Sequence, residues 1–179
     1  MRYLKQLGLL AVAATALMAF AGTASATSVT SSEGSTPYVV LTSTNSKLDG
    51  SFVTIECSHS KIEYRIEQHG AGVPAGGKVS ALSFTGCNYQ PTILYKGNVV
   101  HHTTGQVTAD EMVVIYHSSV GTCGFTTSAA IGNLTEGAGA TIDINSAKIA
   151  RTSGNFLCGS SGTWTGSYSV TSPSTLEVH

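Results

Sequence analysis

Charge is scarce in this sequence, and its scarcity argues against two classes of protein. Charged residues make up 11% of the 179 residues, with nine basic against ten acidic side chains. Without an excess of lysine and arginine there is no basic stripe to neutralise phosphates, which argues against a nucleic-acid-binding protein. Low charge and abundant Thr, Ser and Gly also argue against a disordered chain, which combines high net charge with low hydrophobicity. The composition therefore favours an extracellular β-protein.

Closely spaced cysteines are also absent. The spacing of the four cysteines is too wide for a CxxC redox site or for the ligand pairs of a zinc site. An even number of cysteines in an exported chain favours two disulfides over free thiols. Three connectivities are possible. We favour Cys57–Cys87 with Cys123–Cys158, because each pair closes one half of the domain and each cysteine lies at or near the end of an expected strand.

Helical periodicity occurs only at the N-terminus. Arg2 and Lys5 precede an uncharged, mostly apolar run over residues 7–20, and small residues at 24–26 offer a cleavage site. This pattern is typical of a secretory signal peptide, and the run is short for a spanning helix. We therefore predict a signal peptide over residues 1–26, a mature chain that is secreted or held at the cell surface, and no membrane span after cleavage.

Short apolar segments separated by Gly, Asn, Asp and Ser residues fill the rest of the sequence. In residues 61–67, Ile62, Tyr64 and Ile66 alternate with charged residues, which is typical of an antiparallel strand with one solvated face. Met112–Tyr116 is a continuous apolar run, which favours a central strand buried on both faces. Other strands are expected over residues 38–41, 52–57, 79–87, 92–95, 98–102, 123–127, 140–144, 148–151 and 176–178.

Two further features refine the strand prediction. Lys96-Gly97 lies between two expected strands and indicates a hairpin turn or a bulge. Residues 163–170 alternate strictly, with Trp164, Tyr168 and Val170 on one face. Because a large aromatic side chain close to a disulfide is a natural centre for a small core, this strand is expected to organise the interior.

Together these features predict an all-β fold, namely an antiparallel β-sandwich of Ig-like or jelly-roll-like type stapled by two disulfides. Turn residues interrupt the apolar segments at the interval that such folds show. We assign residues 38–179 to a single β-sandwich domain and expect residues 27–37 to form a flexible polar N-terminal segment.

Five motifs occur along the mature chain: Phe84-x-Gly86-Cys87, Cys123-x-Phe125-x-Thr127, Ile131-Gly132-x-Leu134-Thr135, Leu157-Cys158-Gly159 and Trp164-Thr165-Gly166-x-Tyr168-x-Val170. This series resembles the motifs of a group of uncharacterised secreted bacterial β-proteins with two disulfides. In size, signal peptide, spaced cysteines and Gly/Thr-rich composition, the chain is also distantly similar to the PraB family, secreted pseudomonad proteins named as activators of alkane oxidation and associated with the biofilm matrix. The resemblance implies an extracellular structural or surface-active role and carries over no catalytic residue.

Candidate catalytic and metal-ligating residues are few. Asp143 is the best candidate for a catalytic carboxylate, yet it alternates with Ile142 and Ile144, which places it on a solvated strand face. Adjacent histidines on a strand point to opposite faces and do not chelate one ion without a bulge. We therefore predict no catalytic residue, no metal site and no cofactor. The histidines considered as ligands are His59, His69, His101, His102 and His117.

The sequence leaves three functions open, of which a non-enzymatic structural protein of the cell surface or biofilm matrix ranks first. It would act by association with itself, as a homo-oligomer or fibre, or with matrix components, using the N-terminal segment or Thr175–Val178 as an added strand. The alternative is a binding module for a hydrophobic ligand or glycan, in which Phe125, Trp164 and Tyr168 line the site; an exposed Trp164 would favour it. A secreted hydrolase ranks last.

Overall fold

The computed structural model describes residues 28–34, 36–67, 74–119 and 121–179, so the predicted signal peptide lies outside the described residues. These ranges contain thirteen strands and one short 3-10 turn, η1 (Phe156–Cys158). The strands are β1 (Val29–Ser31), β2 (Tyr38–Ser43), β3 (Ser46–Asp49), β4 (Thr54–Arg65), β5 (Ala75–Cys87), β6 (Thr92–Tyr95), β7 (Asn98–His101), β8 (Gln106–Ser118), β9 (Gly121–Thr135), β10 (Gly137–Ala138), β11 (Thr141–Ser153), β12 (Ser161–Ser172) and β13 (Thr175–Val178).

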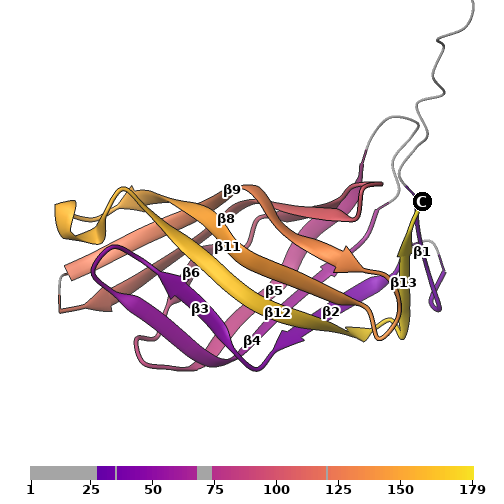
Figure 1. The fold of residues 1–179 in the computed structure, drawn as a ribbon, viewed down its shortest axis with the longest axis horizontal. Helices are drawn as coiled ribbons and strands as arrows, with labels where there is room; N and C mark the ends of the chain where they lie inside the picture. Colours follow the sequence, from indigo (N-terminus) through magenta and orange to yellow (C-terminus); the bar gives the residue numbers. More distant parts are fainter. Residues whose placement is uncertain (1–27, 35, 68–73, 120) are drawn as a thin grey trace, which may run out of the picture.

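Most of the strands form one antiparallel sheet that closes on itself. The pairing order runs β11-β9-β8-β7-β5-β4-β2-β12, and β12 pairs in turn with β11, where the order began. β2 and β3 can be counted as one interrupted strand, and so can β6 and β7. Every strand of this sheet then pairs with the strands that come before and after it in the sheet's sequence order, which is a meander. Figure 1 shows the result as an elongated body in which β3, β11 and β12 lie in front of β5 and β8.

The prediction of an all-β antiparallel fold with two disulfides is confirmed, and the layout is sandwich-like. The order of the strands differs from the expected Ig-like or jelly-roll-like types, which both need Greek-key connections. Here each long strand turns back beside its predecessor, and the last long strand, β12, pairs with β2 and β3, which closes the sheet and joins the two layers. The physical advantage of closure is that it removes sheet edges that would otherwise remain unpaired.

A small three-stranded sheet at one end of the body pairs β1, β13 and β10. Val29 pairs with Val178, and both Val29 and Leu176 are fully buried. Within the N-terminal segment, residues 29–31 thus form a paired strand, for which Val29 supplies an apolar anchor in a polar stretch. Thr175–Val178, expected as a possible added strand for a neighbour, is the middle strand of this sheet and is paired on both sides.

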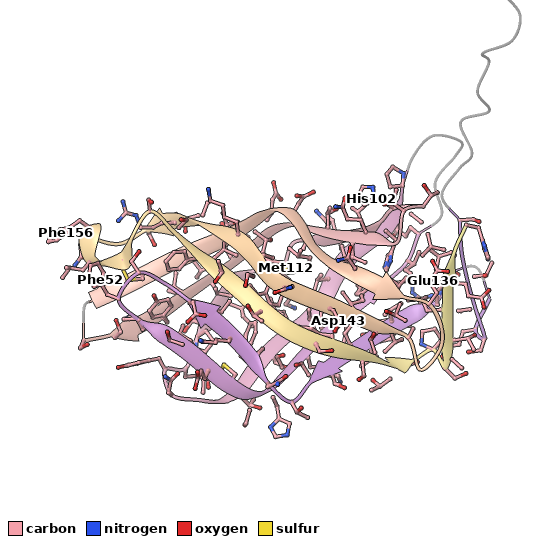
Figure 2. The ribbon with its side chains drawn as sticks, viewed as in Figure 1. Phe52, His102, Met112, Glu136, Asp143 and Phe156 are labelled. Atoms are coloured by element: carbon pink, nitrogen blue, oxygen red, sulfur yellow. A yellow bond between two sulfur atoms is a disulfide. The ribbon has the colours of Figure 1, made fainter. Side chains whose placement is uncertain are left out.

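Both predicted disulfides are confirmed. Cys57 and Cys87 are directly opposed on β4 and β5, and Cys123 of β9 is bonded to Cys158 of η1. The second bond lies near the end of the molecule at which Phe52 and Phe156 are exposed (Figure 2). Because one disulfide ties two strands and the other ties a strand to a turn, they fix different parts of the closed sheet.

Two pairs of predicted strands turn out to be single bent strands. Residues 52–57 and 61–67 belong largely to β4, in which the exposed pair Ser58-His59 interrupts the alternation of buried and exposed residues. Residues 140–144 and 148–151 belong to β11, which has a bulge between Ile144 and Ala147. Such bulges bend a strand and increase its twist, as a closed sheet requires.

The remaining differences concern residues whose apolar pattern was weak or misleading. Ala75–Lys78, which no expected strand covered, begins β5, and the polar strand β3 was not predicted. Met112–Tyr116 is central in the sheet, but only Met112, Val114 and Tyr116 are buried, while the residues between them are half-buried. The expected burial of both faces is therefore wrong, because no layer of the described residues covers the outer side of this run.

The core has Trp164 near its centre, as predicted. Its ring meets the rings of Phe84 and Tyr168 edge-on, at centroid distances of 6.4 and 5.9 Å. Edge-to-face geometry at these distances adds to the stabilisation from buried area. The alternation of residues 163–170 thus identified a strand that does pack its aromatic face inward.

Lys96-Gly97 forms no hairpin, because β6 and β7 both pair with β8 and not with each other. It separates the two strands without a change of register, and the register shift lies between Ile93 and Tyr95. Gly97 has φ +69, and a Cβ atom there would lie 2.0 Å from the carbonyl oxygen of Asp110. Only glycine combines this left-handed conformation with so close an approach of two backbones. Gly97 therefore keeps β6 and β7 aligned along β8.

Replacing Gly97 by alanine should distort the backbone where β6 meets β7. Gly97→Ala is expected to lower the free energy of unfolding by roughly 2–4 kcal/mol, from left-handed strain plus overlap with the Asp110 carbonyl. The matched control is Gly137→Ala, since Gly137 also has positive φ (+98) but nothing lies within 4 Å of its Cβ position. That control should cost about 1 kcal/mol in urea unfolding. Equal losses in both variants would contradict the described contact.

Candidate functional site

The three aromatic side chains predicted to bind a ligand lie in the core. Phe125, Trp164 and Tyr168 are exposed by only 2%, 3% and 0%. The interior space beside Phe125 and Trp164 has a volume of about 20 Å³, which is room for roughly one water molecule. Pockets for small molecules typically measure about 300–1,000 Å³. In this structure the three side chains hold the fold together and present no surface to a ligand.

Tyr168 illustrates why these residues are structural. Ser60 Oγ donates a hydrogen bond of 2.8 Å to the Tyr168 hydroxyl, deep in the core. Burial raises the pKa of Tyr168 to about 12, since the charged form would be desolvated. A neutral hydroxyl with a fixed partner satisfies polar groups in the interior.

The adjacent histidines point into different environments, as predicted. His101 is fully buried, and its Nε2 lies 2.8 Å from the Tyr64 hydroxyl, whereas the half-buried His102 lies 3.2 Å from Thr108 Oγ1. Burial, with a smaller contribution from His102, lowers the pKa of His101 to about 4. Across the described residues, no three metal-ligating side chains come together. His69 lies outside the described residues.

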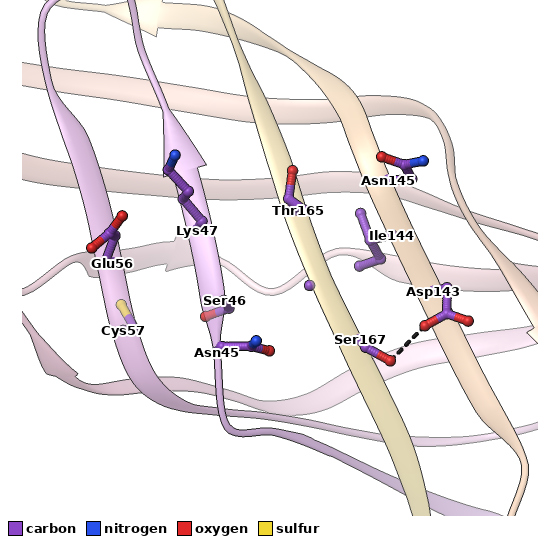
Figure 3. Close-up of a pocket in the computed structure, with 11 residues that line it drawn as sticks. Asn45, Ser46, Lys47, Glu56, Cys57, Asp143, Ile144, Asn145, Thr165 and Ser167 are labelled. Carbon is purple, nitrogen blue, oxygen red and sulfur yellow. Dashed lines mark hydrogen bonds between the residues drawn. The ribbon is translucent and has the colours of Figure 1, made fainter.

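A groove with a volume of about 580 Å³ lies on the outer face of the sheet (Figure 3). It crosses β4, β3, β12 and β11 where the alternation of β4 and β11 is interrupted. Buried lining residues, including Cys57 and Ile144, form its floor. Polar residues, exposed except for the half-buried Lys47, form its rim: Asn45, Lys47, Glu56, Asp143, Asn145 and Ser167.

Asp143 lies on this rim, on the solvated face of β11 as predicted. Ser167 Oγ donates a hydrogen bond of 2.5 Å to Asp143 Oδ1 across the β11–β12 pair (Figure 3). This contact orients the carboxylate along the groove. Sequence reasoning did not group Asp143 with Asn45 or Glu56, because these residues come together only through strand pairing.

A second exposed feature is the free edge of β6. In the part of the chain that the structure describes, β6 pairs with β8 on one side and with no strand on the other. Leu94 and Tyr95 on this strand are 52% and 67% exposed. The strand that faces it, β5, pairs with β7 only over Ala75–Lys78, so the sheet splits beyond this point.

Side chains cap part of the side of β5 that faces the split. Lys96 Nζ donates to the carbonyl oxygen of Ser80 and Gln90 Nε2 to that of Phe84, both at 2.6 Å. Side-chain caps of this kind hinder the addition of a further strand. Across the described residues, no side chain forms a hydrogen bond with the backbone of β6, so β6 presents an edge that side chains leave uncapped.

Comparison with protein-family models, curated proteins and solved structures found no match for this chain. The resemblance to secreted bacterial β-proteins and to the PraB family therefore stays a prediction. Within the described ranges, no helix has the length and apolar character needed to cross a membrane. The two disulfides are consistent with an extracellular protein.

The buried His101 should make stability depend on pH. Its folded-state pKa of about 4 lies below its ordinary value of 6.5, so the unfolded chain takes up the proton first as pH falls. The stability that the folded protein owes to a neutral His101 is fully present above about pH 6.5 and is lost as the pH falls from there to about 4. The free energy of unfolding should fall by about 3 kcal/mol over this range.

Urea unfolding between pH 4 and 8 measures this dependence, with His101→Gln and His102→Gln compared. The His101→Gln variant should lose most of the change in unfolding free energy across this range, whatever its stability at pH 8. The His102→Gln variant should retain it. An unchanged pH profile in His101→Gln would contradict the assignment.

Proposed function

We propose that this protein is an exported, non-enzymatic structural protein of the cell surface or extracellular matrix that associates with copies of itself. The single observation that carries the proposal is the free edge of β6 with its exposed Leu94 and Tyr95. Two disulfides and the predicted signal peptide support an oxidising location outside the cytoplasm.

The edge of β6 is suited to a second copy of the same chain. Unpaired backbone groups on a strand edge are a template for another strand, and native proteins normally blunt such edges with charge, proline or a covering segment. Residues 92–95 carry no charge and no proline. Antiparallel pairing of β6 with its own copy would satisfy both edges at once around a two-fold axis.

The exposed side chains add to this backbone pairing. When two β6 strands pair, the side chains of Leu94 and Tyr95 of one copy approach those of the other copy and form an apolar contact. Burying them removes apolar surface from water at roughly 25 cal/mol per Å². Tyrosine is well suited to an interface because it combines a large apolar ring with a polar end.

A hydrophobic-ligand module has less support. It was predicted to use Phe125, Trp164 and Tyr168, and these side chains pack against the core. Their cavity of about 20 Å³ would have to expand at the cost of that packing.

The test is sedimentation velocity of the oxidised protein, residues 27–179, over a concentration series. The unmodified chain should form dimers or larger assemblies as concentration rises. Leu94→Lys should raise the dissociation constant at least about tenfold, because pairing would bury an unpaired ammonium group. Leu94 is exposed, so the monomer should fold normally.

The matched control is Phe52→Lys, which removes a similarly exposed apolar side chain from a loop instead of a strand edge. It should leave association unchanged. If the unmodified protein sediments as a monomer at all concentrations, the proposal is contradicted. Equal loss of association in both variants would show general surface stickiness and would also overturn the assignment to β6.

A further inference from the structure

The groove on the outer face of β3, β11 and β12 has the shape of a binding site and no structural role in the core. Its volume of about 580 Å³ falls within the range of roughly 300–1,000 Å³ that is typical for ligand pockets. It is distinct from the free edge, since no residue of β6 lines it. What it binds therefore depends on the chemistry of its floor and rim.

The groove is held rigidly from below and from its side. Cys57 in its floor is bonded to Cys87, which fixes β4 against β5. On β11, the bulge places Ser146 at φ +54, and the backbone N–H of Ser146 donates to Thr165 Oγ1 at 3.3 Å. A non-glycine residue held in the left-handed region marks a position that its surroundings determine strongly. A preformed site loses less entropy when it binds.

The rim offers both donors and acceptors of hydrogen bonds, and three of its six residues are neutral. Asn45 and Asn145 each carry an amide with two donors and an acceptor, and Ser167 carries a hydroxyl. Glu56 and Asp143 are acceptors. Lys47, the cation among the lining residues, pairs with Asp49 at 3.1 Å. Two carboxylates and one already-paired cation disfavour an anionic ligand.

The floor provides an apolar surface beneath this polar rim. Cys57, Ile144 and Gly166 line the groove and are buried. A ligand with hydroxyl groups around its edge and carbon–hydrogen faces matches both parts of the site at once. We infer that the groove binds a neutral oligosaccharide, with Asp143 and Asn145 as its main hydrogen-bonding partners.

A peptide fits this groove less well. Extended peptides gain affinity chiefly by pairing their backbone with an open strand edge. Here β3 lies between β12 and β4, and β11 lies between β9 and β12, so both strands are paired on either side. A ligand in the groove therefore meets side chains, and hydroxyl groups are their best partners.

The inference is tested by probing the oxidised protein with an array of neutral and acidic oligosaccharides, followed by calorimetric titration with the strongest neutral one. The double variant Asp143→Ala/Asn145→Ala should bind that sugar at least about tenfold more weakly, since losing hydrogen bonds to charged and neutral groups costs roughly 1.4 kcal/mol or more. Both residues are exposed, so the fold should persist.

Asp110→Ala is the matched control, because Asp110 is an exposed carboxylate on β8 outside the groove. It should bind like the unmodified chain. Three results would overturn the inference: no neutral oligosaccharide bound, stronger binding of acidic sugars, or equal binding by the double variant. Sedimentation of the double variant should match that of the unmodified chain, so failure here is distinguishable from failure of association through β6.

Discussion

The pairing of β12 with β2 and β3 is the interaction on which the rest of this structure depends. It places Ser169 opposite Thr42 and Trp164 opposite Leu48, and it joins the last long strand of the meander to its first strands. Without it, β12 would leave an open edge, as would β2 and β3, and the core around Trp164 would face water on one side. Closure instead satisfies the backbone groups of these strands and encloses an interior filled by side chains.

Because side chains fill the closed interior, the features suited to recognition lie on the outside of the molecule. The aromatic residues that seemed suitable for a ligand are needed to fill the core, and the buried histidine is held neutral beside Tyr64. What remains for recognition is the free edge of β6, where the sheet splits, and the groove, where β11 has its bulge. Both features are irregularities that arise because a regular meander must twist and bend to close. A protein with one surface for its own copies and another for sugars would connect matrix components without any catalytic site.

Local patterns in the sequence predicted much of this fold but little of its surface. The alternation of residues 163–170 correctly oriented Trp164, and the positions of the cysteines favoured the pairing that the structure shows. The same patterns divided β4 and β11 in two, because two exposed residues in succession interrupt the alternation and resemble a strand end; on β11 this break is a bulge. Closure and the free edge could not be predicted from local patterns, since they depend on strand pairs far apart in sequence. Asp143 was correctly placed on a solvated face, yet its grouping with Asn45 and Glu56 also required the closed sheet.

Amide hydrogen–deuterium exchange at low and high protein concentration tests the account most directly, because it reports on closure and on the free edge in one measurement. In dilute protein, amides of β2, β11 and β12 should exchange only through global unfolding, whereas those of β6 should exchange much faster. Raising the concentration should slow exchange in β6 and leave the other strands unchanged. Rapid exchange in β2 and β12 would contradict closure of the sheet, and exchange in β6 that is independent of concentration would contradict self-association through its edge.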